Sequence, residues 1–271
     1  MKLFIDSANI EEIEIGYSAG ILDGITTNPS LMKKAAEKLK IKGEKIDLDE
    51  YIKKILTIAK GTPVSLEVTK TNFEGMIEEG QNLYKRFNQV ANNVVIKIPI
   101  NTSLEPQKDN FDGIKAIKEL SRKCIPVNCT LIFTPEQAMM AAKAGAKMVS
   151  PFAGRIDDYI RKKMNIKFDK SDYFPAEGIN GNNDNGIFSG VDLVMKCVEI
   201  FKQHNIKAEV LAASIRNAQQ LRECALVGAH ISTVPFNVLN EVMVHPKTIE
   251  GMKDFMKDTV EDYSKIGGEK K

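Results

Sequence analysis

The feature that most constrains the fold of this sequence is an alternation of short apolar runs with longer segments of helical periodicity. Eight such runs occur along the chain, and the segments between them repeat apolar residues at helical spacing, as in Ile114, Ile117 and Leu120. This alternation predicts a parallel sheet covered by helices. The runs lie at residues 2–6, 23–28, 63–68, 94–100, 126–133, 147–152, 208–214 and 230–235.

The number of repeating units narrows the fold class further. Eight strand–helix units in roughly 250 residues is the size of a (β/α)8 TIM barrel. A doubly wound open sheet is the alternative, but the chain contains no G-x-G-x-x-G turn, which disfavours it. We therefore predict that residues 1–271 form one α/β barrel domain.

Two segments exceed a minimal barrel. Residues 156–188 are polar and contain "GINGNNDNG", so they form either a surface insertion or a loop that covers the barrel mouth. A further helix is predicted at about residues 247–266, and its apolar stripe covers either the barrel's own helices or a neighbouring subunit. The stripe consists of Ile249, Met252, Phe255, Met256 and Val260.

Composition excludes several classes of partner. The chain has 38 Lys and Arg against 36 Asp and Glu, so its net charge of +2 favours neither a nucleic acid nor a membrane surface. None of its four cysteines forms a C-x-x-C pair and its three histidines are scattered, so we expect no metal site. The start lacks a signal-peptide pattern and no apolar run reaches about 18 residues, which predicts a soluble cytoplasmic protein.

The run "VVIKIPI" at 94–100 places a lysine in an apolar strand. Alternate residues of a barrel strand face the helices and the interior, so the aliphatic set beginning at Val94 faces the helices and Lys97 points inward. Pro99 cannot donate to a central ladder, which puts Lys97 near the carboxyl end of its strand, where barrel enzymes carry their sites. A purely structural lysine neutralised by Asp6 or Glu67 is the alternative, although such pairs seldom outweigh their desolvation.

The same alternation sends other polar side chains inward near strand ends. For a single residue such as Thr130 or Ser214, a polar group at a strand terminus is an equally good explanation. Together, however, these residues predict one pocket. Besides Lys97 they are Asp6, Glu67, Asn128, Thr130, Ser150, Ser214 and Arg216, together with Phe152.

These residue types suit one kind of chemistry. A buried lysine amine can form a Schiff base with a carbonyl, and carboxylates such as Asp6 and Glu67 can move the protons. Sugar hydroxyls would meet Thr27, Asn28, Asn128 and Ser150. Ser214 and Arg216 could bind a phosphate, as could Arg155, unless Arg155 instead pairs with Asp157 or Asp158.

Several long motifs resemble the transaldolase family, in particular its shorter bacterial branch that includes fructose-6-phosphate aldolases. They are "FIDSANI" at 4–10, "GITTNPSL" at 24–31, "VVIKIPI", the stretch 128–158 and "LAASIRN" at 211–217. The resemblance implies a (β/α)8 enzyme without metal or organic cofactor, with Lys97 as the Schiff-base lysine and Asp6 as the acid/base group. It also implies that Asn28, beside Thr26, binds substrate and that Glu67 and Thr130 hold the catalytic water. Ser150 and Phe152 would line the site, and Arg155, Ser214 and Arg216 would bind the phosphate.

Glu67 and Phe152 distinguish two related activities, because the aldolase branch resembles this chain but has glutamine and tyrosine there. The resemblance thus implies a transaldolase of the pentose phosphate pathway. Such an enzyme moves a dihydroxyacetone unit from sedoheptulose 7-phosphate to glyceraldehyde 3-phosphate, giving erythrose 4-phosphate and fructose 6-phosphate. A fructose-6-phosphate aldolase and a non-catalytic sugar-phosphate-binding barrel are the alternatives. The family also implies a homo-oligomer, with a decamer possible, although the C-terminal helix lacks the tryptophan expected there.

Overall fold

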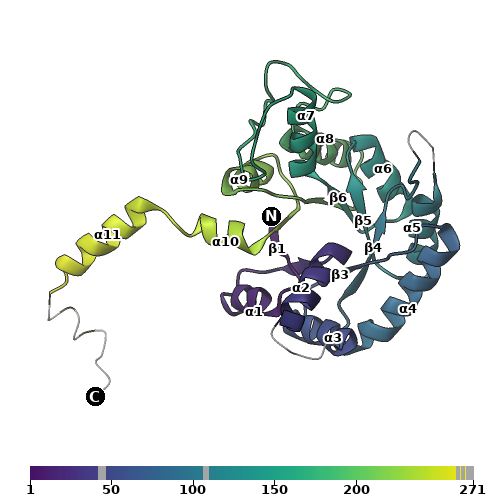
Figure 1. The fold of residues 1–271 in the computed structure, drawn as a ribbon, viewed down its shortest axis with the longest axis horizontal. Helices are drawn as coiled ribbons and strands as arrows, with labels where there is room; N and C mark the ends of the chain where they lie inside the picture. Colours follow the sequence, from purple (N-terminus) through teal and green to yellow (C-terminus); the bar gives the residue numbers. More distant parts are fainter. Residues whose placement is uncertain (42–46, 106–109, 261–262, 264–265, 267–271) are drawn as a thin grey trace.

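The computed structural model describes residues 1–41, 47–105, 110–260, 263 and 266. In this part of the chain, eight parallel strands close into a barrel in chain order (Figure 1). Each predicted apolar run contains one of these strands, so the (β/α)8 prediction is confirmed and the open-sheet alternative is wrong. The strands are β1 (Lys2–Asp6), β2 (Gly24–Thr26), β3 (Val64–Glu67), β4 (Val94–Pro99), β5 (Val127–Ile132), β6 (Met148–Pro151), β7 (Glu209–Ala212) and β8 (Ile231–Val234).

Helices surround the barrel (Figure 1), and local sequence signals set their ends. The sixth helix begins at a capping box between Thr134 and Gln137, with Pro135 in its first turn, and it stops at Gly145 in the left-handed conformation. The helices are α1 (Ile10–Ser18), α2 (Pro29–Ile41), α3 (Leu48–Ile58), α4 (Phe73–Ala91), α5 (Asp112–Arg122), α6 (Pro135–Ala144), α7 (Ala153–Lys163), α8 (Gly190–Gln203), α9 (Ala218–Leu226), α10 (Phe236–Val242) and α11 (Pro246–Lys257).

Two apolar clusters confirm the predicted alternation of side chains. Val94, Ile96 and Ile98 of β4 belong to the large cluster between the strands and the helices. Val95 lies between Val94 and Ile96 in the chain and therefore points inward, and it belongs to a smaller apolar cluster that fills the barrel interior. Its other buried members are Phe4, Met148, Leu211, Ala213 and Ile231. This apolar plug fills most of the barrel interior, and Ser65 of β3 is a polar side chain at the level of Val95.

The apolar cluster inside the barrel packs closely against β2 because position 24 is a glycine. Gly24 of β2 lies opposite Phe4 of β1 in the register of the sheet. A Cβ atom at position 24 would lie 2.6 Å from the Phe4 ring, closer than carbon atoms pack. The absence of a side chain at Gly24 thus makes room for the aromatic ring inside the barrel.

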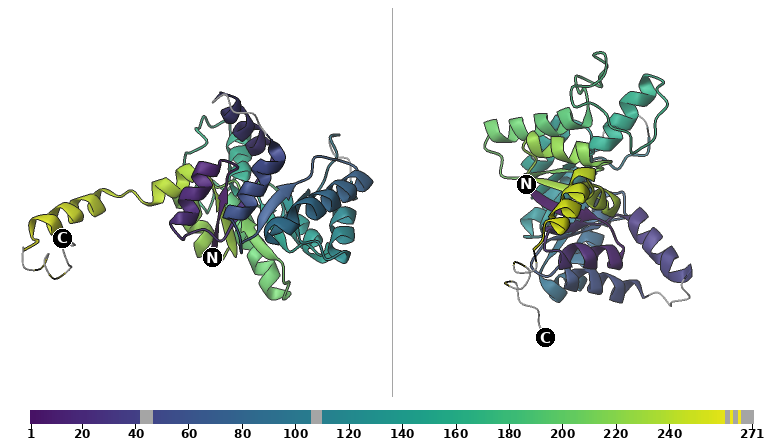
Figure 2. Two further views of the ribbon diagram at one scale, coloured as in Figure 1. Left: turned by 90° about the horizontal axis from the view of Figure 1, so that it is seen from below. Right: turned by 90° about the vertical axis from the view of Figure 1, so that its left-hand side faces the viewer.

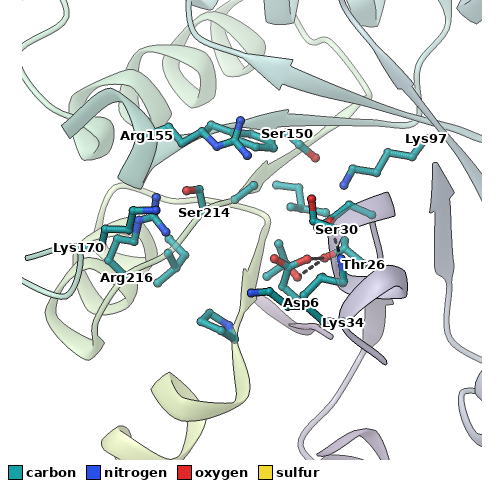
Figure 3. Close-up of a pocket in the computed structure, with 18 residues that line it drawn as sticks. Asp6, Thr26, Ser30, Lys34, Lys97, Ser150, Arg155, Lys170, Ser214 and Arg216 are labelled. Carbon is teal, nitrogen blue, oxygen red and sulfur yellow. Dashed lines mark hydrogen bonds between the residues drawn. The ribbon is translucent and has the colours of Figure 1, made fainter. Parts of the chain in front are cut away.

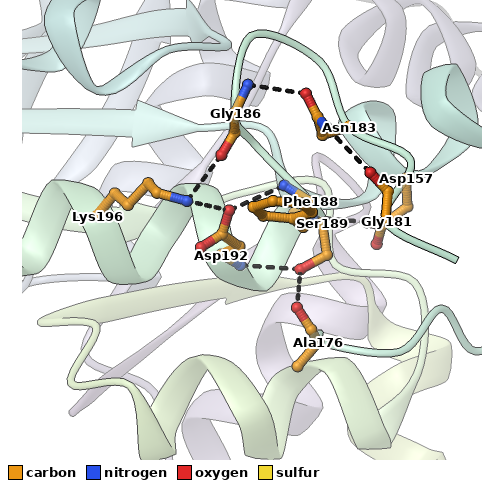
Figure 4. A network of polar contacts seen from close by, with 10 residues as sticks. Asp157, Ala176, Gly181, Asn183, Gly186, Phe188, Ser189, Asp192 and Lys196 are labelled. Carbon is orange, nitrogen blue, oxygen red and sulfur yellow. Dashed lines mark hydrogen bonds and ion pairs between the residues drawn. The ribbon is translucent and has the colours of Figure 1, made fainter. Parts of the chain in front are cut away.

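The polar segment after β6 differs from its predicted bounds of 156–188. Residues 156–163 belong to helix α7, because Ile156 and Ile160 are buried in the outer core and so follow a helical repeat. The irregular part runs from 164 to 189. It is tied to the start of α8: Ser189 donates to the carbonyl of Ala176 over 2.5 Å and accepts from the N–H of Asp192 over 2.9 Å (Figure 4).

Charged contacts fix the C-terminal end of the irregular segment 164–189. Lys196 of α8 pairs with Asp192 and also donates to the carbonyl of Gly186 over 2.9 Å (Figure 4). Asp192 in turn accepts a hydrogen bond from the N–H of Phe188 over 2.9 Å. The Gly- and Asn-rich stretch is therefore fixed at its far end by the first turns of α8.

The predicted C-terminal helix is present, and it extends away from the barrel (Figures 1 and 2). It begins at Pro246 and ends at Lys257, earlier than the predicted 266, and part of the remainder lies outside the described residues. Ile249, Met252, Phe255 and Met256 each expose more than half of their surface. The stripe does not cover the barrel's own helices. None of the described helices is long and apolar enough to cross a lipid bilayer.

Candidate active site

A cavity of about 330 Å³ opens at the carboxyl ends of the strands (Figure 3). It brings together side chains from β1, β2, β4, β6 and the turn after β7, which lie far apart in the sequence. Lys97 and Asp6 lie at one end, and Arg155, Ser214 and Arg216 lie at the other (Figure 3). The predicted site residues that line it are Asp6, Thr26, Asn28, Lys97, Ser150, Phe152, Arg155, Ser214 and Arg216.

Lys97 is buried, with only 5% of its surface exposed. Its Nζ lies 3.1 Å from Oε2 of Glu67 and donates to the carbonyl of Thr27, also over 3.1 Å. Lys97 and Glu67 are register partners on neighbouring strands β4 and β3, so the sheet itself brings the ammonium and the carboxylate together. Glu67 Oε2 is thus close enough to accept a proton from the Lys97 ammonium group.

Asp6 ends β1 and faces the same cavity. Its Oδ1 accepts a hydrogen bond of 2.7 Å from Thr26 Oγ1, and Thr26 Oγ1 lies 2.6 Å from Thr233 Oγ1. Burial raises the pKa of the Asp6 carboxyl, while the positive charge of Lys97, the Thr26 hydrogen bond and Arg155 oppose the rise. Asp6 is therefore a partly buried carboxyl group whose protonation depends on its neighbours, as acid/base chemistry requires.

Further polar side chains lie deeper in the barrel than the opening of the cavity and are joined by hydrogen bonds. Ser150 donates to Asn128 Oδ1 over 2.7 Å, and Asn128 Nδ2 donates to Ser65 Oγ over 3.2 Å. Thr27 Oγ1 donates to the carbonyl of Ser65 over 2.7 Å. The side chain of Thr27 thus joins the end of β2 to β3, and that of Asn128 joins β5 to β6 and, across the barrel interior, to β3. Neither side chain lines the cavity, although the Thr27 carbonyl contacts Lys97.

Thr130 is fully buried beside β4, opposite Pro99 in the register. Among the described residues its hydroxyl has no hydrogen-bond partner. The strand is irregular here: a bulge separates Cys129 from Ile132, and Leu131 has a φ of 58°. Bulges of this kind redirect side chains near active sites.

The far end of the cavity is cationic. Arg216 pairs with Asp158, with Nη2 to Oδ2 at 2.9 Å, while its buried Nε has no partner among the described residues. Asp158 pairs with Arg216, and Asp157 accepts hydrogen bonds from Gly190 and Gln220. Among the described residues the suggested salt bridge from Arg155 to either carboxylate is not present. Arg155 is exposed and its guanidinium lies 5.0 Å from the centre of the Phe152 ring.

Buried contacts hold the turn that carries Ser214 and Arg216. A Cβ atom on Gly154 would lie 2.1 Å from the Ser214 carbonyl, so only glycine allows this approach of α7 to the turn. The main-chain N–H of Arg216 donates to Gln220 Oε1 over 2.9 Å, and Gln220 Nε2 donates to Asp157 over 2.6 Å. Burial raises the pKa of Asp157 to about 7. This network fixes the position of the Arg216 main chain.

Four polar residues that line the cavity are not among those predicted from the sequence. Ser30 lies in the motif "TTNPSL", and Lys34 lies one helical turn after it on the same face of α2, so helical spacing from this motif could have indicated both. Thr233 shares the inward parity of Ile231 on β8. Lys170 belongs to the irregular segment after α7, and no repeating pattern indicated its position.

Fold and site together define a (β/α)8-barrel protein with a lysine–carboxylate centre at one end of its cavity and cationic side chains at the other. In the described part of the chain no three His, Cys, Asp or Glu side chains lie close enough together to hold a metal ion. The family model for transaldolase/fructose-6-phosphate aldolase matches residues 3–270, and the chain belongs to this family.

Similar proteins include three called probable transaldolases. The protein of Thermoplasma acidophilum is 41% identical over 258 residues, which cover 95% of each chain. The protein of Nitrosopumilus maritimus is 42% identical over 95% of this chain and 94% of its own. The protein of Bacteroides thetaiotaomicron is 40% identical over 99% of this chain and its entire own length.

The raised pKa of Asp6 gives a prediction for pH titration. In the folded protein Asp6 should lose its proton at a higher pH than the ordinary value of 3.8. Replacing Thr26 with valine removes a hydrogen bond that favours the carboxylate, so the pKa should rise further. Titration of the Asp6 carboxyl by carbon-13 NMR measures both values. Thr57→Val, on the outer helix α3, is the control and should leave the titration unchanged. A lower Asp6 pKa in Thr26→Val would contradict this account of the site.

Proposed function

We propose that this protein is a transaldolase of the pentose phosphate pathway. It moves a dihydroxyacetone unit from sedoheptulose 7-phosphate to glyceraldehyde 3-phosphate, giving erythrose 4-phosphate and fructose 6-phosphate. The observation that carries the proposal is the buried Lys97, whose Nζ lies 3.1 Å from the Glu67 carboxylate in a cavity that it shares with Asp6. An interior lysine beside two carboxyl groups is suited to Schiff-base formation and to the proton transfers that accompany it.

In the proposed mechanism, the Lys97 amine attacks C2 of the donor, and loss of water gives a protonated imine. The imine withdraws electrons as the C3–C4 bond breaks, and Asp6 accepts the proton of the C4 hydroxyl, so that the aldose leaves. The remaining enamine attacks the aldehyde carbon of the acceptor, and Asp6 returns its proton to the new hydroxyl. Water then releases the product from Lys97.

In this proposal, Glu67 and Thr130 bind the water molecule that imine formation releases and that hydrolysis consumes, and Glu67 accepts its proton. Glu67 lies within hydrogen-bonding distance of the reacting nitrogen, and it can accept a proton from water. The Thr130 hydroxyl is fully buried near the same strand end and has no partner among the described residues, which supports a role in holding a water molecule.

The two ends of the cavity match the two ends of a sugar phosphate. Thr26, Asn28 and Ser150 offer hydroxyl and amide groups for the sugar hydroxyls near Lys97. Arg155, Ser214 and Arg216 offer donors for a phosphate at the other end. Among the residues that the structure describes, the buried Nε of Arg216 has no hydrogen-bond partner, and this supports the assignment because an unpaired buried donor is costly.

Two residues favour group transfer over simple aldol cleavage. Position 67 holds a carboxylate where the aldolase branch has an amide, and position 152 holds a phenylalanine where that branch has a tyrosine. Phe152 packs against Phe133, with ring centres 5.9 Å apart, and has no hydroxyl to donate a proton. A fructose-6-phosphate aldolase is the second candidate. A non-catalytic binder is disfavoured by the intact set of Lys97, Asp6 and Glu67.

We predict that Glu67→Gln lowers transfer more than it lowers aldol cleavage. An amide keeps the size of the side chain but cannot accept the proton, so we expect about a 100-fold loss of kcat for transfer. Two coupled assays measure the effect: erythrose 4-phosphate formation from both substrates, and dihydroxyacetone release from fructose 6-phosphate alone. Glu79→Gln is a control outside the site, because Glu79 binds the Thr69–Lys70 turn.

The proposal is wrong if the wild-type protein releases dihydroxyacetone as fast as it transfers it, since the aldolase alternative would then hold. Full transfer activity in Glu67→Gln would remove Glu67 from the mechanism while leaving the proposed reaction intact.

We also propose that the protein is a cytoplasmic homo-oligomer. All four cysteines are free, which fits a reducing compartment. The apolar stripe of α11 extends away from its own barrel without cover, and an exposed apolar face of this kind is suited to a neighbouring copy. The alternative of a stripe packed on its own barrel does not occur.

This assembly gives a prediction for variants of α11. Replacing both Met252 and Phe255 with serine removes apolar area from the stripe, so the particle mass in analytical ultracentrifugation should fall towards that of one 30.1 kDa chain. Asp254→Asn, on the polar face of the same helix, should leave the mass unchanged. An unchanged mass in the double variant would show that α11 does not hold copies together.

A further inference from the structure

The mechanism uses neither Lys34 nor Lys170, two cations that line the cavity; Lys34 lies near Asp6 and Lys170 lies near Arg216 (Figure 3). Lys170 lines the cavity of about 330 Å³ and also a more open outer chamber of about 520 Å³. The two share Ile215, Arg216 and Pro235 as well as Lys170, so Lys170 lies where they meet. Among the described residues no carboxylate pairs with its ammonium group. Figure 3 shows it at the same end of the cavity as Arg216 and Ser214.

Lys170 belongs to the irregular segment 164–189, and buried contacts fix the chain on both sides of it. Arg161 of α7 is 4% exposed, and its guanidinium lies 4.9 Å and 5.0 Å from the ring centres of Phe168 and Phe174. Its Nη2 also donates to the carbonyl of Asp172 over 2.8 Å. One buried arginine therefore holds three residues that flank Lys170.

The next residue after Lys170 is tied to the turn that carries Arg216. Asn217 Nδ2 donates to the carbonyl of Ser171 over 3.0 Å, and Asn217 Oδ1 accepts from the N–H of Gln220 over 2.8 Å at the start of α9. Asn217 directly follows Arg216 in the chain. The main-chain positions of Lys170 and Arg216 are thus coupled through Asn217 and do not vary independently.

The charges at this end of the cavity favour a doubly charged anion. Arg155, Arg216 and Lys170 contribute three positive charges, and the Asp158 carboxylate, paired with Arg216, offsets one of them. Asp169 lines the outer chamber but not the inner cavity. A phosphate monoester carries about −1.5 to −2 at neutral pH, which matches the remaining charge.

We propose that Lys170 is a third cationic ligand of the substrate phosphate and determines the preference for phosphorylated sugars. This inference rests on the proposed function for the identity of the sugar, but the binding of phosphate does not. Arg216 and Ser214 supply directional hydrogen bonds, whereas a lysine acts as a mobile point charge at the open side of the anion. The segment 164–189 thereby contributes to the site and is more than a surface insertion.

The test compares Lys170→Met with Lys167→Met and Lys170→Arg. Lys167 is an exposed lysine of the same segment that does not line the cavity, so its variant controls for the loss of one charge. Isothermal titration with inorganic phosphate gives a readout that does not depend on turnover. Lys170→Met should weaken phosphate binding about fivefold, while the other two variants stay within about twofold of the wild type.

Kinetics give the second readout. With glyceraldehyde 3-phosphate as acceptor, Lys170→Met should raise KM about fivefold and leave kcat nearly unchanged, and with unphosphorylated glyceraldehyde KM should not change. Unchanged phosphate binding in Lys170→Met, or equal rises of KM for both acceptors, would overturn the assignment. Phosphate binding that depends on Lys170 in a protein without transfer activity would instead refute the proposed function and support Lys170 as an anion ligand.

Discussion

The site depends on one constraint, the alternation of side chains in a closed barrel. Aliphatic residues such as Ile96 and Ile98 must face the helices, so every intervening residue of β4 points into the barrel. Phe4, Val95 and Leu211 fill the lower interior and exclude water from it. Lys97 lies above this plug, where it is buried but still reaches the cavity. The register of β3 and β4 then supplies Glu67 as its partner.

The distribution of charge along the cavity follows from this arrangement. Near the plug, the positive charge of Lys97 is matched by Glu67 at 3.1 Å, and Asp6 lies in the same buried region. At the outer end, cations exceed carboxylates, since Asp158 is the one carboxylate in the described part of the chain that pairs with an arginine there. A substrate with a carbonyl at one end and a phosphate at the other would therefore bind in one orientation. Elements outside the strands build the outer end: α7, the segment 164–189 and the turn after β7.

Sequence patterns predicted the inner end of the site better than the outer end. Strand periodicity has a short repeat, and Lys97, Asp6 and Glu67 lie on strands, so their direction could be read from neighbouring apolar residues. Helix α7 was mistaken for part of an irregular insertion, because its polar residues outnumber Ile156 and Ile160, the apolar positions that bury it. The pairing of Asp158 with Arg216 and the position of Lys170 depend on contacts between segments distant in the chain. No local pattern encodes such contacts.

The central claim is that Lys97 forms a covalent imine with a ketose phosphate. It can be tested by incubating the protein with fructose 6-phosphate, reducing with borohydride and mapping the adduct by mass spectrometry. Reduction would convert a protonated imine into a stable secondary amine on the lysine that formed it. We predict a single modified peptide that contains Lys97 and no modification without the sugar. A label on another lysine, or no sugar-dependent label in folded protein, would contradict it.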